Sequence, residues 1–353
     1  AVALGAVAGR SEYGLEVLKD ADVHAVEAGR RFIEEKRISV QLKEGITEKL
    51  YIEVTVTASG HYAEAIISGG HTTFVYMRRD DEVLLDERKP SSEQANVQDV
   101  ELTLQRVYDF ATTSPVEELQ FILESRRLNK AAAESAFATD YGHSLGKTLR
   151  GEKEIKIMGD SIFSRILSYT SSACDARMGG AMVPVMSNSG SGNQGISCSV
   201  PVYIYAQENQ CNEEQLLRAL ALSNLTVIYI KQSLGRLSAL CGCVVAATGS
   251  AAGITYLMGG NYEEITYAIK NMIANISGMI CDGAKPGCAL KVTSGVSTAI
   301  FSAYLAMQHS YADSTEGIVE NDIDRTIRNL TRIGHDGMQV TDDLILDIMT
   351  HKK

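Results

Sequence analysis

The pattern of hydrophobic and polar positions changes from strand-like to helix-like along the chain. Residues 12–36 carry apolar side chains at helical spacing among charged ones, which predicts a surface helix. Turn-forming pairs at 59–60, 69–70 and 80–81 are typical of hairpins. We therefore expect an antiparallel sheet of four or five strands with a helix against it. Its strands are predicted from short runs rich in β-branched and aromatic residues at 38–44, 50–59, 61–68, 72–79 and 82–87.

Helical spacing dominates after a polar linker at 87–98, with helices predicted over 102–114 and 115–151 and Pro115 at a first helical position. Three later stretches contain no charged residue. They are rich in Gly, Ala, Ser, Thr, Asn and Gln, so we expect close-packed core helices rather than membrane spans. These stretches are 178–207, 237–262 and 292–308. The predicted fold class is α+β, with a partial α+β domain at 1–112, incomplete at its N-terminus, and an all-α domain at 113–353.

Composition narrows the class of protein. The chain has 353 residues, 45% of them hydrophobic and 22% charged, enough to bury one or two ordinary cores. With 33 basic and 44 acidic residues, a net charge of −11 and no Trp, it is not expected to bind nucleic acid. Seven irregularly spaced cysteines do not form a secreted disulfide framework, which predicts reduced thiols and a cytoplasmic location. The first residues lack an initiator Met and predict a chain cut within a longer product.

A loop of glycines and small polar residues is the first candidate site. Its glycines let the backbone turn successive N–H groups toward one point, and its hydroxyl and amide side chains add donors. We interpret it as a cradle for a carboxylate or another small anion, with a flexible surface loop as the alternative. No Lys follows the glycines, so it is not a P-loop. The candidate residues are Asn188, Ser189, Gly190, Ser191, Gly192, Asn193 and Gln194.

Cys241, Cys243, Cys281 and Cys288 form the second candidate site. Glycines and a proline bend the chain between the last two, so that both thiolates could meet one ion or cluster. Thiolates select zinc, copper(I) or iron–sulfur clusters. The CxxC knuckles of a structural zinc site are absent, whereas three thiolates and an open position suit a [4Fe–4S] cluster. Ordinary buried core cysteines are the alternative.

Three further residues carry chemistry in suggestive positions. His71 follows two glycines between predicted strands, where it is either an acid or base near neutral pH or part of the turn. Asp175 and Arg177 are the last charges before the first uncharged stretch, and they form a buried pair, orient the loop or close a helix. Histidines in charged or helical surroundings are given no functional role; these are His24, His143, His309, His335 and His351.

Three long sequence motifs contain the glycine-rich loop and the four clustered cysteines. They are SSACDARMGGAMVPVMSNSGSGNQGI at 171–196, RLSALCGCVVAATGSAAGI at 236–254 and ISGMICDGAKPGCALKV at 276–292. They resemble the catalytic domain of the L-cysteine desulfidase family, which is related to the iron–sulfur L-serine dehydratase alpha chain. GLEVLKDA and SGGHTTFVY resemble that family too, so the similarity runs from about residue 5 to the C-terminus.

The resemblance implies a [4Fe–4S] cluster held by Cys241, Cys281 and Cys288, without pyridoxal phosphate. It makes the helical domain the catalytic one and implies β-elimination, in which L-cysteine and water give pyruvate, ammonia and sulfide. Donors of the 188–194 loop would fix the substrate carboxylate, and His71 is the best available general base. Cys243 is the less expected ligand of its pair.

Other functions stay open at this point. They are an L-serine dehydratase, a non-catalytic amino-acid-binding or regulatory protein without the cluster, and a structural zinc protein. We expect a small amino acid, L-cysteine or L-serine, as the partner, no membrane partner, and a homodimer by base rate. Family members begin with an additional segment that includes an LGCTEP-like motif. Its absence here indicates either a truncated chain, which the abrupt start favours, or a protein that lacks this part of the site.

Overall fold

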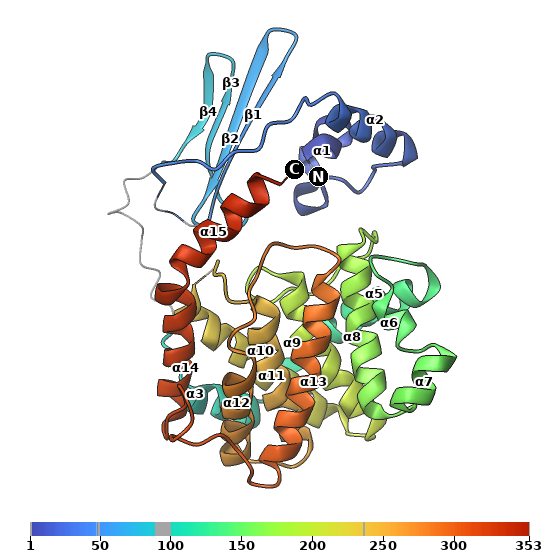
Figure 1. Ribbon diagram of the computed structural model, residues 1–353, viewed down its shortest axis with the longest axis vertical. Helices are drawn as coiled ribbons and strands as arrows, with labels where there is room; N and C mark the ends of the chain where they lie inside the picture. Colours follow the sequence, from blue (N-terminus) through green and yellow to red (C-terminus); the bar gives the residue numbers. More distant parts are fainter. Residues whose placement is uncertain (1, 47, 49, 89–99, 236, 353) are drawn as a thin grey trace. The chain divides into compact units, whose positions relative to one another are not determined.

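The computed structural model describes residues 2–46, 48, 50–88, 100–235 and 237–352. They fall into two compact units, one made of 1–45 with 344–353 and the other of 46–343. The α+β class is confirmed, because a four-stranded antiparallel sheet precedes a long series of helices (Figure 1). The predicted linker at 87–98 lies, from residue 89 onward, outside the described residues.

The smaller unit contains α1 (Val2–Ala8), the 3₁₀ turn η1 (Ser11–Glu16) and α2 (Val23–Glu34). The helix predicted over 12–36 is therefore too long. Its true start is set by Asp22, whose side chain accepts a hydrogen bond from Ala25 N at 2.8 Å and caps α2.

The strand predicted at 38–44 is wrong. These residues are irregular and pair with no strand among the described residues. Val40 and Leu42 are 72% and 56% exposed, so the apolar side chains that suggested a strand are not buried.

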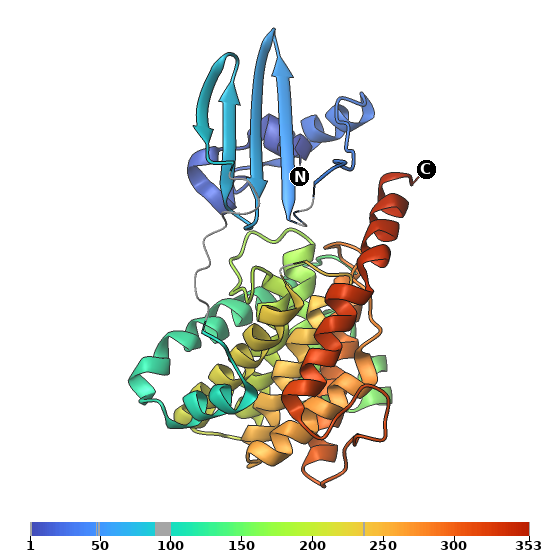
Figure 2. The same ribbon diagram turned by 90° about the vertical axis from the view of Figure 1, so that its left-hand side faces the viewer.

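The sheet is a simple meander in the order β1-β2-β3-β4 (Figure 2). Ser59 and Gly60, both at positive φ (51° and 83°), connect β1 to β2 in the conformation expected of a two-residue hairpin turn. The four later predicted strands and their turns are confirmed, and His71 lies in the turn between β2 and β3. The strands are β1 (Tyr51–Ala58), β2 (His61–Ser68), β3 (Phe74–Arg79) and β4 (Glu82–Asp86).

The remaining elements are helical, and α9 and α11 lie among the other long helices of the bundle (Figure 1). Pro115 is the N-cap of α4, one residue before the predicted position. The first elements are α3 (Leu104–Thr113), α4 (Val116–Leu119), η2 (Gln120–Ile122), α5 (Leu123–Ala138), α6 (Leu145–Thr148), α7 (Glu152–Met158) and α8 (Ile162–Met178). Next come α9 (Gly192–Glu208), α10 (Glu213–Leu234), α11 (Gly242–Leu257) and α12 (Tyr262–Ile276). The last are α13 (Cys288–Ala306), α14 (Ile323–Arg332), the π-helical turn η3 (Ile333–Gly337) and α15 (Gln339–Thr350).

The uncharged stretches form the helices α9, α11 and α13, as predicted. Several of their buried hydroxyls bond within the helix; Thr255 Oγ1, for example, donates to Ala251 O at 2.7 Å. Gly249 lets α11 approach α10 closely, because an added Cβ would lie 2.4 Å from Ser223 O. Within the described part of the chain, α13 alone is long and apolar enough to cross a membrane, and half of it is buried inside the protein, as in the core helix of a globular domain.

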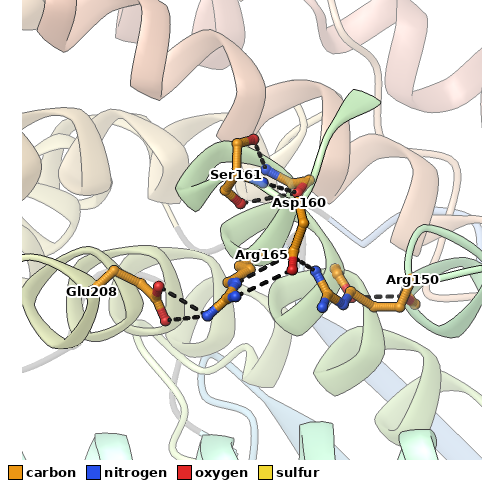
Figure 3. Close-up of polar contacts among 8 residues, drawn as sticks. Arg150, Asp160, Ser161, Arg165 and Glu208 are labelled. Atoms are coloured by element: carbon orange, nitrogen blue, oxygen red, sulfur yellow. Dashed lines mark hydrogen bonds and ion pairs between the residues drawn. The ribbon is translucent and has the colours of Figure 1, made fainter. Parts of the chain in front are cut away.

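An ion-pair network fastens one end of the α8–α9 pair (Figure 3). Asp160 accepts hydrogen bonds from Arg150 Nη1 at 2.7 Å and from Arg165 Nε at 3.2 Å, and Arg165 also donates to Glu208 at the end of α9. The loop that joins α8 to α9 lies at the opposite end of the pair, about 25 Å away by the rise of a 17-residue helix.

Candidate functional site

The loop between α8 and α9 ends in a tight turn. The backbones of Asn188 and Ser191 exchange two hydrogen bonds, of 3.1 and 3.0 Å. Between them, Ser189 and Gly190 adopt φ of 49° and 79°. Positive φ at both central positions is the geometry that favours glycine, which accounts for the glycine here. The turn leads the chain directly into the N-terminus of α9.

Three of the predicted binding side chains hold the loop itself. Asn188 is buried, and its Nδ2 donates to Asn224 Oδ1 on α10 at 3.0 Å. Ser189 Oγ donates to Asn188 Oδ1 at 2.8 Å. Ser191 is the N-cap of α9, and its Oγ accepts from Gln194 N at 3.4 Å. These side chains form hydrogen bonds within the protein, so their visible role is to fix the shape of the loop.

Arg177, near the end of α8, lies across the start of α9. Its Nη1 donates to Asn193 Oδ1 at 3.2 Å. A Cβ added to Gly192 would lie 2.2 Å from Arg177 Nε, so any side chain at Gly192 would displace the arginine. Of the roles considered from the sequence, Arg177 has that of orienting the loop.

Asp175 does not pair with Arg177. It is fully buried, and its Oδ2 accepts a hydrogen bond from Gly146 N at 3.0 Å. Its Oδ1 has no hydrogen-bond partner among the residues described here. Burial raises the pKa of Asp175, although N–H groups of Gly146 and its neighbours oppose the shift. This carboxylate therefore anchors the segment before α6 against α8.

Gln194 connects the loop to the cysteines. It is 6% exposed, and its Oε1 is buried without a hydrogen-bond partner in the described part of the chain. A Cβ added to Gly242 would lie 2.9 Å from Gln194 Nε2, and Gly242 separates Cys241 from Cys243. The two candidate sites thus meet at this contact. A buried acceptor without a partner is an atom that an N–H group of a ligand can use.

Backbone pairing brings Cys241 and Cys281 onto adjacent segments. Leu240 and Ile280 form an isolated antiparallel bridge. The N–H groups of Cys241 and Cys281 each donate to a carbonyl of the other segment, at 2.9 and 2.6 Å. Cys288 is the first residue of α13, a helix that packs on α11, which starts at Gly242. All three expected ligands therefore belong to segments that border α11.

The thiols interact electrostatically. Burial raises the pKa of Cys281, and negative charge on Cys241 and Cys288 raises it further. The Cys243 thiol lowers the pKa of Cys241, helped by the N–H groups at the start of α11 and opposed by burial. The pKa of Cys243 is raised by the same pairing with Cys241. Cys241 is therefore the member of this pair that ionises first.

No three His, Cys, Asp or Glu side chains, among those the structure describes, lie close enough together to hold a single metal ion. A [4Fe–4S] cluster is a larger body that binds each thiolate through a different iron. The donor set fits such a cluster chemically, because all seven cysteines are free thiols and thiolates are its usual ligands.

His71 lies at the tip of the loop. A Cβ added to Gly190 would lie 2.5 Å from His71 Cε1 and 2.7 Å from its Nδ1. The imidazole therefore covers the tight turn at Gly190, and His71 is exposed. The structure brings His71 to the loop, while its ring has no described contact with the cysteines.

Two lysines near the cysteines were not predicted as site residues from the sequence. Burial lowers the pKa of Lys231 on α10 to about 8, and the nearby Cys281 opposes this shift. Lys291 Nζ donates to Ile280 O at 2.7 Å and is paired with Asp282. A signal for Lys231 was present, because it is a lone charge directly after the apolar run 225–230.

Fold and site together define an α+β protein with a glycine-rich loop facing a set of reduced cysteines. The chain belongs to the serine dehydratase alpha chain family, whose model matches residues 12–347. A UPF0597 protein of Bacteroides fragilis is 66% identical over 352 residues, which cover all of this chain and 82% of the relative. A UPF0597 protein of Oleidesulfovibrio alaskensis is 45% identical over 354 residues, again with all of this chain and 82% of the relative covered. The predicted relationship to the serine dehydratase alpha chain is thereby confirmed.

Proposed function

We propose that this protein is an iron–sulfur-dependent lyase, independent of pyridoxal phosphate, that converts L-cysteine and water to pyruvate, ammonia and sulfide. The observation that carries the proposal is the contact between Gln194 and Gly242, because it joins a loop suited to an amino acid to a set of thiols suited to a cluster. Membership of the serine dehydratase alpha chain family supports elimination as the reaction class.

Cys241, Cys281 and Cys288 would hold a [4Fe–4S] cluster. When bound, the cluster supplies a Lewis-acidic iron that makes the substrate's thiol or hydroxyl a better leaving group. The charge of Lys291 lowers the pKa of Cys241 and of Cys281, which favours their thiolate forms. A reducing cytoplasm suits this set of thiols.

The protein's own groups would position the amino acid. N–H groups at the start of α9 favour the negative carboxylate. Gln194 Oε1 would accept a hydrogen bond from the substrate's ammonium group, since this oxygen is buried without a partner among the described residues. Binding at both ends orients the Cα–H bond for removal.

His71 would take the α-proton. Its exposed ring reaches the loop at Gly190, and histidine is the side chain that most often serves as a general acid or base. Loss of the β-substituent leaves an enamine, which hydrolyses to pyruvate and ammonia. The protein then releases these products, and His71 gives up its proton before the next turnover.

L-Serine is the second candidate substrate. The family model that matches this chain is that of a serine dehydratase, and the same elimination on serine expels water in place of sulfide. The thiol and hydroxyl of the two amino acids differ at one atom, which the loop and Gln194 would not contact.

Anaerobic reconstitution tests the proposal. The protein is loaded with iron and sulfide, its iron content is measured, and it is incubated with L-cysteine or L-serine. We expect sulfide and pyruvate in equal amounts from L-cysteine, and slower release of pyruvate from L-serine. Faster turnover of L-serine would favour the second candidate. If a cluster-loaded sample forms neither product, the proposed lyase activity is contradicted. The remaining function would then be amino-acid binding without catalysis.

A further inference from the structure

We propose that Arg177 binds the α-carboxylate of the substrate and thereby restricts the site to amino acids with a free carboxylate. The identity of the substrate rests on the proposed function, but the assignment of the carboxylate to Arg177 rests on the contacts around this side chain.

Arg177 is held in a defined position. Its Nη1 donates to Asn193 Oδ1 at 3.2 Å and contacts Met178 Sδ at 3.8 Å. The Nε and Cδ atoms pass over Gly192, where an added Cβ would lie 2.2 and 2.7 Å from them. A half-buried arginine held along its length loses little further freedom on binding a ligand.

The charge of Arg177 has no acidic partner among the described residues. In the ranges that the structure describes, no Asp or Glu oxygen lies within ion-pair distance of its guanidinium. The nearest acid in sequence, Asp175, is directed to Gly146 instead. The hydrogen bonds of Arg177 in this part of the chain engage Nη1 alone, which leaves donors on Nε and Nη2. A guanidinium with two donors available matches the two oxygens of a carboxylate.

Arg177 also lies close to a cysteine of its own helix. Burial raises the pKa of Cys174, negative charge on Cys288 raises it further, and the charge of Arg177 lowers it. The arginine is thus within electrostatic range of a thiol that also feels Cys288. Arg177 passes over Gly192, and Gln194 lies in the same first turn of α9, so both groups border the N-terminus of this helix.

The side chains at the loop have two different roles. The side chains of Asn188 and Ser191 form its framework. Among the described residues, Arg177 is a cation without a carboxylate partner and Gln194 Oε1 an acceptor without a donor, and these are the two groups that point to a ligand. Together they describe a site for a zwitterion. An amine without a carboxylate would lose the contact with Arg177 but keep that with Gln194.

Substitution of Arg177 tests the assignment. Arg177→Gln and Arg177→Lys are compared with Arg165→Gln, a matched change on the same helix within the ion-pair network at its other end. The readouts are KM and kcat for L-cysteine, the inhibition constant of cysteamine, which lacks the carboxylate, iron content, and the rise in Tm caused by L-cysteine.

We expect Arg177→Gln to raise KM about 10- to 100-fold, the range of a lost charge-assisted hydrogen bond. The cysteamine constant and the iron content should stay unchanged, Arg177→Lys should recover part of the loss, and Arg165→Gln should leave KM as it is. An unchanged KM in Arg177→Gln, or an equal loss for L-cysteine and cysteamine, would overturn the assignment.

The same experiment separates this assignment from the proposed function. Suppose that the cluster-loaded protein forms no product, yet L-cysteine raises the Tm of the wild type and not that of Arg177→Gln. This result would contradict the proposed lyase activity and support the binding of the carboxylate by Arg177. If the wild type turns over L-cysteine and Arg177→Gln does so with the same KM, the lyase stands and the site is elsewhere. If L-cysteine neither raises the Tm of the wild type nor is turned over by it, the assignment of the carboxylate to Arg177 is overturned as well.

Discussion

Gln194 lies directly over the backbone of Gly242, so closely that a Cβ at Gly242 would meet Gln194 Nε2 at 2.9 Å and Cδ at 3.0 Å. Gly242 is the residue between Cys241 and Cys243, at the first position of α11. The contact explains why a glycine separates these cysteines. It also makes the positions of the loop and of the first thiol pair depend on each other.

Gly242→Ala should therefore disturb both parts of the site. Adding a methyl group to a packed region costs about 1–3 kcal/mol, and here it also displaces Gln194. We expect a lower free energy of unfolding in urea, less iron after reconstitution and a higher KM. Gly278→Ala is the control, because an added Cβ there has nothing within 4 Å. Equal behaviour of the two variants would show that the contact is not tight.

Substitution of each of the four clustered cysteines should change the iron content of the reconstituted protein to a different extent. We expect Cys241→Ala, Cys281→Ala and Cys288→Ala to lose iron and the visible absorbance of the cluster with the helical content intact. Cys243→Ala should keep most of its iron, since the role of Cys243 is to lower the pKa of Cys241 by its hydrogen bond. Cys211→Ala, between α9 and α10, is a matched control. Full iron content in any of the first three variants would show that the ligands are assigned wrongly.

The parts of the fold that the sequence predicted well depend on local patterns. The hairpin turns at 59–60 and 80–81, and the helices α9 and α11 that arise from uncharged stretches, are determined by neighbouring residues in the sequence. The strand at 38–44 failed because pairing is a property of two segments, and alternation in one of them does not supply the other.

In the candidate site, too, the local features could be predicted from the sequence and the non-local contacts could not. The glycine-rich loop and the cysteines were visible as motifs, but what joins them is non-local. Leu240 pairs with Ile280 across forty positions, and Asn188 bonds Asn224 from another helix. That Asn188 stabilises the loop rather than remaining free for a ligand could not be predicted without this partner.

His71→Gln should lower activity without unfolding the protein. Loss of a general base typically costs about 10²–10⁴-fold in kcat, and the exposed ring contributes little to packing. Glutamine keeps the size and polarity of the side chain but cannot take a proton. His61→Gln is the control, since His61 is an exposed histidine of the same sheet that pairs with Asp80. If the two variants have the same kcat and pH profile, the base is another residue.

The network at Asp160 should affect stability and leave the site untouched. Arg165 and Arg150 lower the pKa of Asp160 to about 2, whereas an aspartate in the unfolded chain has a pKa of about 3.9. The folded carboxylate keeps its charge to lower pH, so its contribution to stability is present above about pH 4 and is lost as the pH falls toward 2.

Asp160→Asn removes this contribution. The difference in urea midpoint between wild type and variant should therefore be constant from pH 5 to 7, in round values, and shrink as the pH falls through the window between the two pKa values. It should be small, because the carboxylate is exposed, and smaller still in high salt, which screens surface ion pairs. Iron content and KM should match the wild type, because the loop lies at the other end of α8. A difference that grows toward acid pH would mean that Asp160 is protonated in the folded protein and that its arginines do not hold it charged.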